Sequence, residues 1–255
     1  MQKFHFYNFI LFCLNYKKMD VIIKKILKRI NIFKTKVSQK DIIDKLDNKK
    51  TSLENFMIKE NFQLYKEAKK FSRSLEIKSS KKLKKIEYDL GGGGAYNLIY
   101  FITRQIKPEI VLETGVAAGY SSYAFLEAMN KNKIGKLFSS DFPYFRIPNP
   151  VKYIGILVDK KYKKNWELFL DGDERNVIKI KKKLKKKIDL IHYDSDKTYE
   201  GKEKFFKMVN NLIKENTFII IDDIQDDNFF LEYVNNNKKK YKIFKFKNKF
   251  LGLIY

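Results

Sequence analysis

The hydrophobic pattern between residues 95 and 255 alternates between strand-like runs and helical spacing. Ile110, Val111 and Leu112 form a short apolar run of the kind found in a parallel strand buried on both faces. Similar runs recur, each separated by a segment with apolar residues at helical spacing, so we predict a parallel sheet wound on both faces by helices. The other predicted strands are 136–140, 166–170, 188–193 and 217–221, and the predicted helices are 95–106, 120–130, 159–164 and 199–214.

The C-terminal residues predict a change of strand direction. Residues 241–246 and 250–255 both have strand character, and the few residues between them cannot hold a parallel crossover, which needs about a dozen or more. They must form an antiparallel hairpin. The predicted fold is therefore α/β, a doubly wound and mostly parallel seven-stranded sheet that closes with a reversed edge strand.

The N-terminal third has helical spacing and no sustained strand signal. We predict a basic helical extension or cap over residues 1–85 and a catalytic domain over 86–255. The apolar run 4–16 is shorter than the roughly 20 residues that a membrane span needs. Two interpretations of it stay open, an interfacial helix and an upstream extension with the natural start at Met19, and we favour the second.

Net charge is the most unusual feature of the composition. The formal charge of +24 is typical of a partner of nucleic acid or of a membrane surface, but only five of the 54 basic residues are arginine. Arginine makes the bidentate contacts that read bases and phosphates, and a bias toward Lys, Asn and Ile is what an AT-rich coding sequence produces. We predict no specific nucleic-acid partner and leave open a homodimer and a weak association with anionic membranes. The single cysteine, Cys13, excludes an intramolecular disulfide and favours a reducing, cytoplasmic location.

Two glycines follow the central strand. Gly115 and Gly119 supply a turn without Cβ atoms, where a ligand could lie against the backbone at the start of a helix. Their Gly-x-x-x-Gly spacing differs from the Gly-x-Gly-x-x-Gly of dinucleotide folds, which counts against a nicotinamide cofactor. Glycines that serve packing alone remain an equal alternative. A further run, 91–94, breaks the helical pattern one helix upstream, and a plain linker is the usual explanation of such a run.

Acidic residues stand at the ends of five predicted strands. The carboxyl ends of strands are where ligands sit in an open α/β sheet, so five acidic ends in succession indicate a binding site. Asp141 follows Gly119 by 22 residues, which suits a carboxylate that accepts hydrogen bonds from ribose hydroxyls, although a helix cap or loop acid is the alternative. The acids are Glu113, Asp141, Asp173, Asp194 and the pair Asp222 and Asp223.

Three motifs carry a resemblance to a known family. VLETGVAAGYSS (111–122), DLIHYDSDKTYE (189–200) and IIIDDI (219–224) resemble the S-adenosylmethionine (SAM)-dependent O-methyltransferases related to catechol O-methyltransferase, and more closely a bacterial group that acts on small molecules or glycans. The reversed C-terminal hairpin is the arrangement of class I methyltransferases. The similarity runs from about residue 91 to residue 255 and leaves about the first 85 residues uncovered.

The resemblance implies roles for the cofactor residues. Glu113, Gly115, Gly119 and Ser121 would surround the methionine part of SAM. Asp141 would hold the ribose, and Asp173 would lie beside the adenine. A motif of the Asn/Asp-Pro-Pro-Tyr type is missing after the fourth strand, where the chain reads Asp-Ser-Asp-Lys (194–197), and this disfavours methylation of amino groups on bases.

The resemblance also implies a divalent cation, usually magnesium, between Asp194 and the Asp222 and Asp223 pair. Three converging carboxylates repel one another unless they are protonated or a cation bridges them, and such a cation could lower the pKa of an acceptor hydroxyl. Helix caps are the alternative role for these aspartates.

Lys197 lies three residues after Asp194, as a lysine does in catechol-type enzymes. A lysine whose pKa is lowered can act as general base, and a solvated loop lysine is the alternative. We interpret His192 as structural.

These features together predict a SAM-dependent O-methyltransferase that acts, with metal assistance, on a hydroxyl of a small molecule or sugar, with Asp194 and Lys197 as catalytic residues. The alternative is a basic protein that binds RNA or a membrane surface and whose methyltransferase fold is non-catalytic or acts on nucleic acid.

Overall fold

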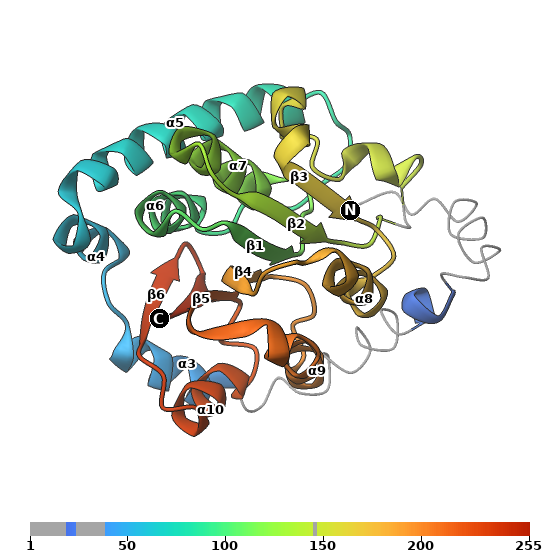
Figure 1. Cartoon of the computed structure of the whole chain (residues 1–255). Helices are drawn as coiled ribbons and strands as arrows, with labels where there is room; N and C mark the ends of the chain where they lie inside the picture. Colours follow the sequence, from blue (N-terminus) through green and yellow to red (C-terminus); the bar gives the residue numbers. More distant parts are fainter. Residues whose placement is uncertain (1–18, 24–38, 145–146) are drawn as a thin grey trace.

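A seven-stranded sheet lies between two layers of helices in the computed structural model, which describes residues 19–23, 39–144 and 147–255 (Figure 1). The apolar run 4–16 and Cys13 lie outside the described residues. The strand order is β3-β2-β1-β4-β5-β7-β6. The strands are β1 (Ile110–Thr114), β2 (Lys136–Ser140), β3 (Trp166–Phe169), β4 (Ile188–Tyr193), β5 (Ile213–Asp222), β6 (Tyr241–Phe246) and β7 (Lys249–Ile254).

The centre of the sheet is parallel and apolar, as the hydrophobic runs predict. Leu112 of β1 is buried and stands in register between Phe138 of β2 and Ile191 of β4. Only β7 is reversed among these strands, because it pairs antiparallel with both β5 and β6. The predicted hairpin is confirmed, but the reversed strand lies one position inside the sheet and β6 forms the edge. A turn with Lys247 in the left-handed region joins the two strands.

The largest departure from the predicted elements lies before β5. Helix α9 (Tyr199–Val209) ends earlier than the predicted 199–214, and β5 begins at Ile213 after a short 3₁₀ turn (Asn210–Leu212). Thr217 explains the early strand, because its hydroxyl accepts a hydrogen bond from the Lys214 N–H and donates one to the Ile188 carbonyl, both at 2.7 Å. These bonds hold the polar start of β5 against β4. This stretch has no apolar run from which a strand could be predicted.

Four helices cover one face of the sheet (Figure 1). α4 (Leu53–Glu60) and α5 (Phe62–Leu83) pack on α6 (Tyr96–Ile106), which packs on α7 (Tyr120–Asn132). Phe71 of α5 stacks on Tyr100 of α6 with ring centroids 4.2 Å apart. The predicted N-terminal cap thus shares a hydrophobic core with the predicted catalytic domain, and the boundary at residue 85 stays a prediction.

Helices α3 (Gln39–Lys49), α8 (Asp173–Lys183), α9 and α10 (Phe229–Asn236) cover the opposite face (Figure 1). The hydrophobic pattern did not identify α10. Residues 19–23 are helical and reach α8 through an ion pair of 2.9 Å between Asp20 and Arg175. Across the described ranges, every helix is too short or too polar to cross a membrane.

Candidate cofactor and acceptor site

The glycine turn after β1 lies against the end of β4. Gly115 has a φ of 82° and donates its N–H to the carbonyl of Ser140 at 2.9 Å, and a Cβ there would overlap the carbonyl oxygen of Asp194. Gly119 has a φ of 94°, and its Cβ would lie 2.8 Å from the Cα of Gly155. Both glycines are therefore required by backbone that approaches closely. The strand order reverses between β1 and β4, which is where open α/β sheets bind ligands.

Asp141 fixes this turn from the end of β2. Its Oδ2 accepts the N–H groups of Val116 and Ala117 at 2.9 and 2.8 Å, and its Oδ1 accepts the N–H of Phe142 at 2.6 Å. Ala117 has a φ of 49°, an uncommon conformation for a residue with a Cβ, which these hydrogen bonds help to hold. The structure thus gives Asp141 a role in shaping the turn, and its contact with a ribose stays a prediction.

Glu113 and Ser121 contact each other inside the domain. The Glu113 carboxylate is fully buried and accepts hydrogen bonds from the hydroxyls of Ser121, Ser122 and Ser139 at 2.5 to 2.7 Å. Burial raises the pKa of Glu113, although His192 and the three hydroxyls oppose the shift. The carboxylate ties β1 to α7 and β2, and the predicted contacts of Glu113 and Ser121 with the cofactor stay predictions.

Asp173 stands at the start of α8 and accepts the hydroxyl of Ser140 at 2.6 Å. Asn176, one turn further along α8, was not predicted. It is fully buried, and its amide donates to the Ser140 hydroxyl at 2.9 Å and to the carbonyls of Phe169 and Asp141 at 3.0 and 3.1 Å. The ends of β2 and β3 are joined to α8 in this way, at the place where the resemblance puts the adenine.

Asp194, at the end of β4, has an unusual electrostatic environment. Burial, with the charge of Asp222 adding to it, raises the pKa of Asp194 to about 7. His192 lies beneath, with Nδ1 4.0 Å from Glu113 Oε1 and Nε2 3.7 Å from Asp222 Oδ1. Burial lowers the pKa of His192, but the nearby carboxylates, Asp222 first among them, outweigh it and the net shift is upward. A buried imidazole thus separates two buried carboxylates.

Asp223 has its carboxylate paired with two lysines. Its side chain is 2% exposed, forms an ion pair with Lys197, and receives Lys249 Nζ at 3.1 Å. Burial raises the pKa of Asp223, and the two ammonium groups outweigh burial and lower it. Burial lowers the pKa of Lys197, and Asp223 outweighs it and raises the pKa. Lys197 is therefore held protonated, which is the opposite of what a general base requires.

The predicted metal residues do not fit a divalent cation as they are arranged here. The described part of the chain has no group of three or more His, Cys, Asp or Glu side chains placed to hold a metal ion. Asp223 contacts lysines, and Asp222 faces His192. The magnesium site stays a prediction from the resemblance.

The glycine run 91–94 covers the ends of these strands and is more than a linker. A Cβ on Gly93 would lie 2.7 Å from the Tyr120 ring and 2.8 Å from the Tyr96 ring, and a Cβ on Gly94 would overlap Asp222 Oδ2. Gly92, by contrast, has no neighbouring atom within 4 Å of the position of a Cβ. The run thus brings bare backbone against the Asp222 carboxylate.

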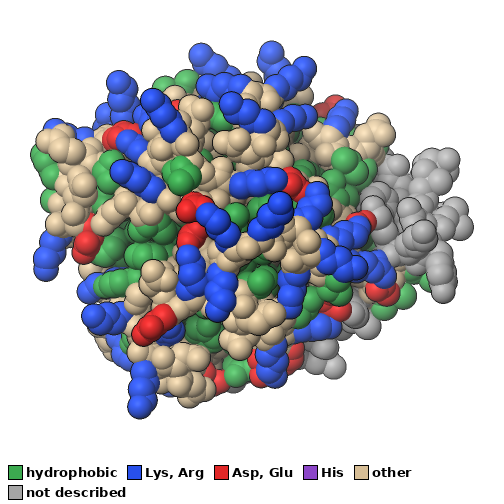
Figure 2. Space-filling model, in the orientation of Figure 1, with side chains coloured by type: hydrophobic (Ala, Val, Ile, Leu, Met, Phe, Trp, Pro, Cys, Tyr) green, Lys and Arg blue, Asp and Glu red, His purple; other side chains and the backbone are tan. Residues whose placement is uncertain are grey.

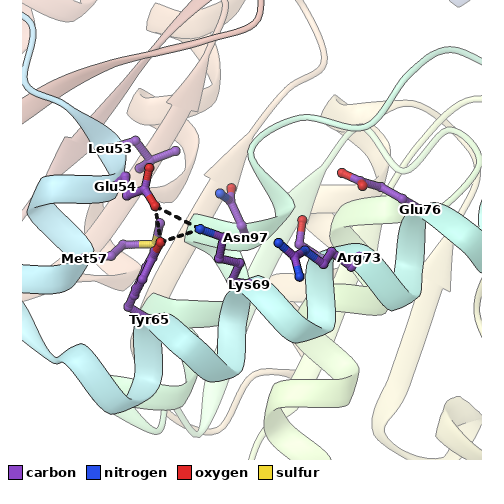
Figure 3. A pocket seen from close by; sticks show the side chains of 9 residues that line it. Leu53, Glu54, Met57, Tyr65, Lys69, Arg73, Glu76 and Asn97 are labelled. Atoms are coloured by element: carbon purple, nitrogen blue, oxygen red, sulfur yellow. Dashed lines mark hydrogen bonds and ion pairs between the residues drawn. The ribbon is translucent and has the colours of Figure 1, made fainter.

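A cavity of about 330 Å³ lies among α4, α5 and α6 (Figure 3). Its residue Glu76 accepts the Tyr96 hydroxyl at 2.6 Å, and the Tyr96 ring stacks on Tyr120 at 5.7 Å. Figure 3 shows Glu54, Tyr65 and Lys69 joined at one end, with Arg73 and Glu76 further along α5. The lining residues are Leu53, Glu54, Met57, Tyr65, Lys69, Ser72, Arg73, Glu76 and Asn97.

Residues 112–224 match a family model described as a methyltransferase domain. The match spans the glycine turn and the ends of β2, β3, β4 and β5. This stretch of the chain is therefore similar to a methyltransferase domain. No curated protein has a significantly similar sequence.

Solved structures of methyltransferases share the fold of this chain. The O-methyltransferase TomG of Streptomyces achromogenes, in complex with SAM, is 12% identical with a TM-score of 0.55, over 71% of this chain and 88% of that one. The O-methyltransferase of Bacillus cereus, in complex with SAH, is 11% identical with a TM-score of 0.53, over 82% and 99%. A methyltransferase of Geobacter sulfurreducens is 14% identical with a TM-score of 0.53, over 71% and 89%. At these identities the likeness establishes the fold.

Proposed function

We propose that this chain transfers a methyl group from SAM to a hydroxyl oxygen of a small molecule or sugar. The observation that carries the proposal is the contact between Gly115 and the backbone of Asp194, where the strand order reverses. It brings the predicted cofactor turn next to the predicted catalytic carboxylate. SAM and SAH in the TomG and B. cereus structures support the choice of cofactor.

The residues of the turn fit SAM. Gly115, Ala117 and Gly119 have left-handed backbone, and the turn opens directly into α7, whose first N–H groups have no partner within the helix. We place the methionine part of SAM against this turn, the ribose at Asp141 and the adenine toward Asp173. When bound, SAM supplies an electrophilic methyl group on a sulfonium.

The acceptor hydroxyl has to lose its proton as its oxygen forms the new bond to the methyl carbon and the bond from that carbon to sulfur breaks. Asp194 is placed beside the turn, and its pKa of about 7 lets it accept this proton near neutral pH. Lys197, held protonated by Asp223, supplies positive charge to the oxygen as it becomes negative. We therefore assign the base to Asp194 and an electrostatic role to Lys197.

The cavity among α4, α5 and α6 supports a small acceptor. Its volume of about 330 Å³ lies at the lower end of the range for ligand pockets. Leu53 and Met57 give it an apolar part, and Arg73, Asn97 and Glu76 give it hydrogen-bonding groups. This mixture suits a polar ring that carries hydroxyls.

Calorimetry with SAM tests the proposal. The wild type should bind SAM, and Gly115→Val should abolish binding because the new side chain would collide with the β4 backbone. Asp141→Asn is the milder variant, since it weakens the hydrogen bonds that hold the turn but adds no heavy atom. Gly92→Ala, which meets no neighbour, is the control. Absence of SAM binding in the wild type, or equal binding by all four proteins, would refute the proposal.

The alternative of a nucleic-acid or membrane-surface protein gains no support from the structure. Figure 2 shows lysine and arginine side chains spread over the whole visible face, with acidic side chains among them, and not gathered into one stripe. A steep salt dependence of RNA binding would be the observation in its favour.

A further inference from the structure

Two lysine ammonium groups occupy the carboxylate where the resemblance predicts a divalent cation. Lys249 Nζ lies 3.1 Å from both oxygens of Asp223, and Lys197 pairs with Oδ2. Because the Asp223 side chain is 2% exposed, little of the carboxylate remains for another ligand. Two ammonium groups carry the same total charge as one magnesium ion.

The two lysines reach Asp223 from different parts of the fold. Lys197 follows the end of β4, and Lys249 is the first residue of β7 in the C-terminal hairpin. Asp223 has a φ of 54°, a conformation that a residue with a Cβ keeps only when its surroundings hold it. Gln225, whose amide lies 3.3 Å from Asp223 Oδ1, completes these surroundings. The carboxylate is thus fixed toward the lysines by backbone and side chains alike.

A divalent cation at Asp223 would have to displace both lysines, since like charges on one carboxylate repel one another. We propose that Lys197 and Lys249 take the place of a divalent cation on the acceptor side of the site, so that methyl transfer by this chain needs no metal. The claim that methyl transfer needs no metal is the functional half and rests on the proposed function. The claim that the two lysines exclude a divalent cation from Asp223 is the binding half and does not depend on methyl transfer.

Binding of Mn²⁺ to the full chain, followed by electron paramagnetic resonance, tests the binding half without turnover. The wild type should leave Mn²⁺ free at about 1 mM, the affinity of the weakest physiological cation sites. The double variant Lys197→Met with Lys249→Met keeps the side-chain length, removes both charges and should bind Mn²⁺ at least about tenfold more tightly. Lys247→Met is the matched control, because Lys247 lies in the same hairpin with its Nζ 5.5 Å from the Phe246 ring.

The wild-type measurement decides the matter even if the double variant does not fold. Tight Mn²⁺ binding by the wild type that Asp223→Asn removes would overturn the proposal. So would a folded double variant with no gain in Mn²⁺ affinity. Calorimetry with SAM separates the two proposals, because failure to bind SAM refutes methyl transfer and leaves the Mn²⁺ result on Asp223 intact.

Discussion

Gly94 offers the sharpest test of how the site is built. A Cβ at this position would overlap Oδ2 of Asp222, whose side chain is 6% exposed, so either the loop or the carboxylate has to move. Overpacking of this kind costs about 1 to 3 kcal/mol. In a domain of this size each kcal/mol lowers the melting temperature by about 2 to 4 °C. We therefore expect Gly94→Ala to lose about 1 to 3 kcal/mol of stability and to melt about 2 to 4 °C lower for each kcal/mol lost.

Gly92 provides the control within the same loop. Neither Gly92 nor Gly94 has a left-handed φ, so alanine is compatible with the backbone at both positions and the contact with Asp222 is what separates them. Gly92→Ala meets no atom and should be neutral or stabilising by up to about 1 kcal/mol. The difference between the two variants therefore isolates the effect of the contact.

The second readout is the titration of His192 by NMR, which is practical because the chain has two histidines. Asp222 raises the pKa of His192, so a displaced Asp222 should let that pKa fall in Gly94→Ala and leave it unchanged in Gly92→Ala. Equal melting temperatures and equal His192 titrations in the two variants would show that Gly94 does not pack against the Asp222 carboxylate.

Three further predictions concern stability. Burial opposes ionisation of Glu67, but Arg104, Tyr100 and Lys131 together outweigh it and lower the pKa to about 2. The ionised form therefore stabilises the fold above pH 4.5, and this stabilisation disappears as the pH falls toward 2. With allowance for solvent screening, Glu67→Gln should lose about 1 to 2 kcal/mol at pH 7, and a urea titration should find this difference vanishing in acid. Lys202 is 1% exposed and lies 2.9 Å from Asp227, so Lys202→Met should lower the free energy of unfolding by about 3 to 5 kcal/mol in the same assay. Adding Asp227→Leu should restore stability, and no recovery would mean that the charge pair is not the cause. Phe71→Ala should cost about 3 to 5 kcal/mol in chemical unfolding, and a loss below about 1 kcal/mol would show that α5 is not part of the core.

The sequence predicts those elements whose residues make an apolar run between turn signals. Strands β2 and β4 have the predicted bounds, because their runs end sharply at polar residues. The start of β5 could not be predicted in this way, since the stretch around Lys214 is polar and is held in the strand by Thr217.

The same division applies to the site. Strand order alone brings the acidic strand ends together, so Asp194 and Asp222 could be predicted to lie close to each other. The direction of each side chain could not, because it depends on tertiary partners. Lys249 is one of many lysines, with no motif that points to Asp223. Asn176 has no pattern that marks it as the link between two strands, β2 and β3, and helix α8.

The stacked pair of Phe71 and Tyr100 limits how the N-terminal helices can be exchanged. Helix α5 lines the cavity with some of its side chains and packs into the hydrophobic core with others. An exchange of the N-terminal helices for those of a relative would also exchange the residues of α4 and α5 that belong to the core shared with α6. Under the proposed function, new acceptor preferences should therefore arise by substitution at cavity positions such as Arg73. A chimera joined at residue 85 should lose stability, because it would pair Tyr100 with a foreign α5.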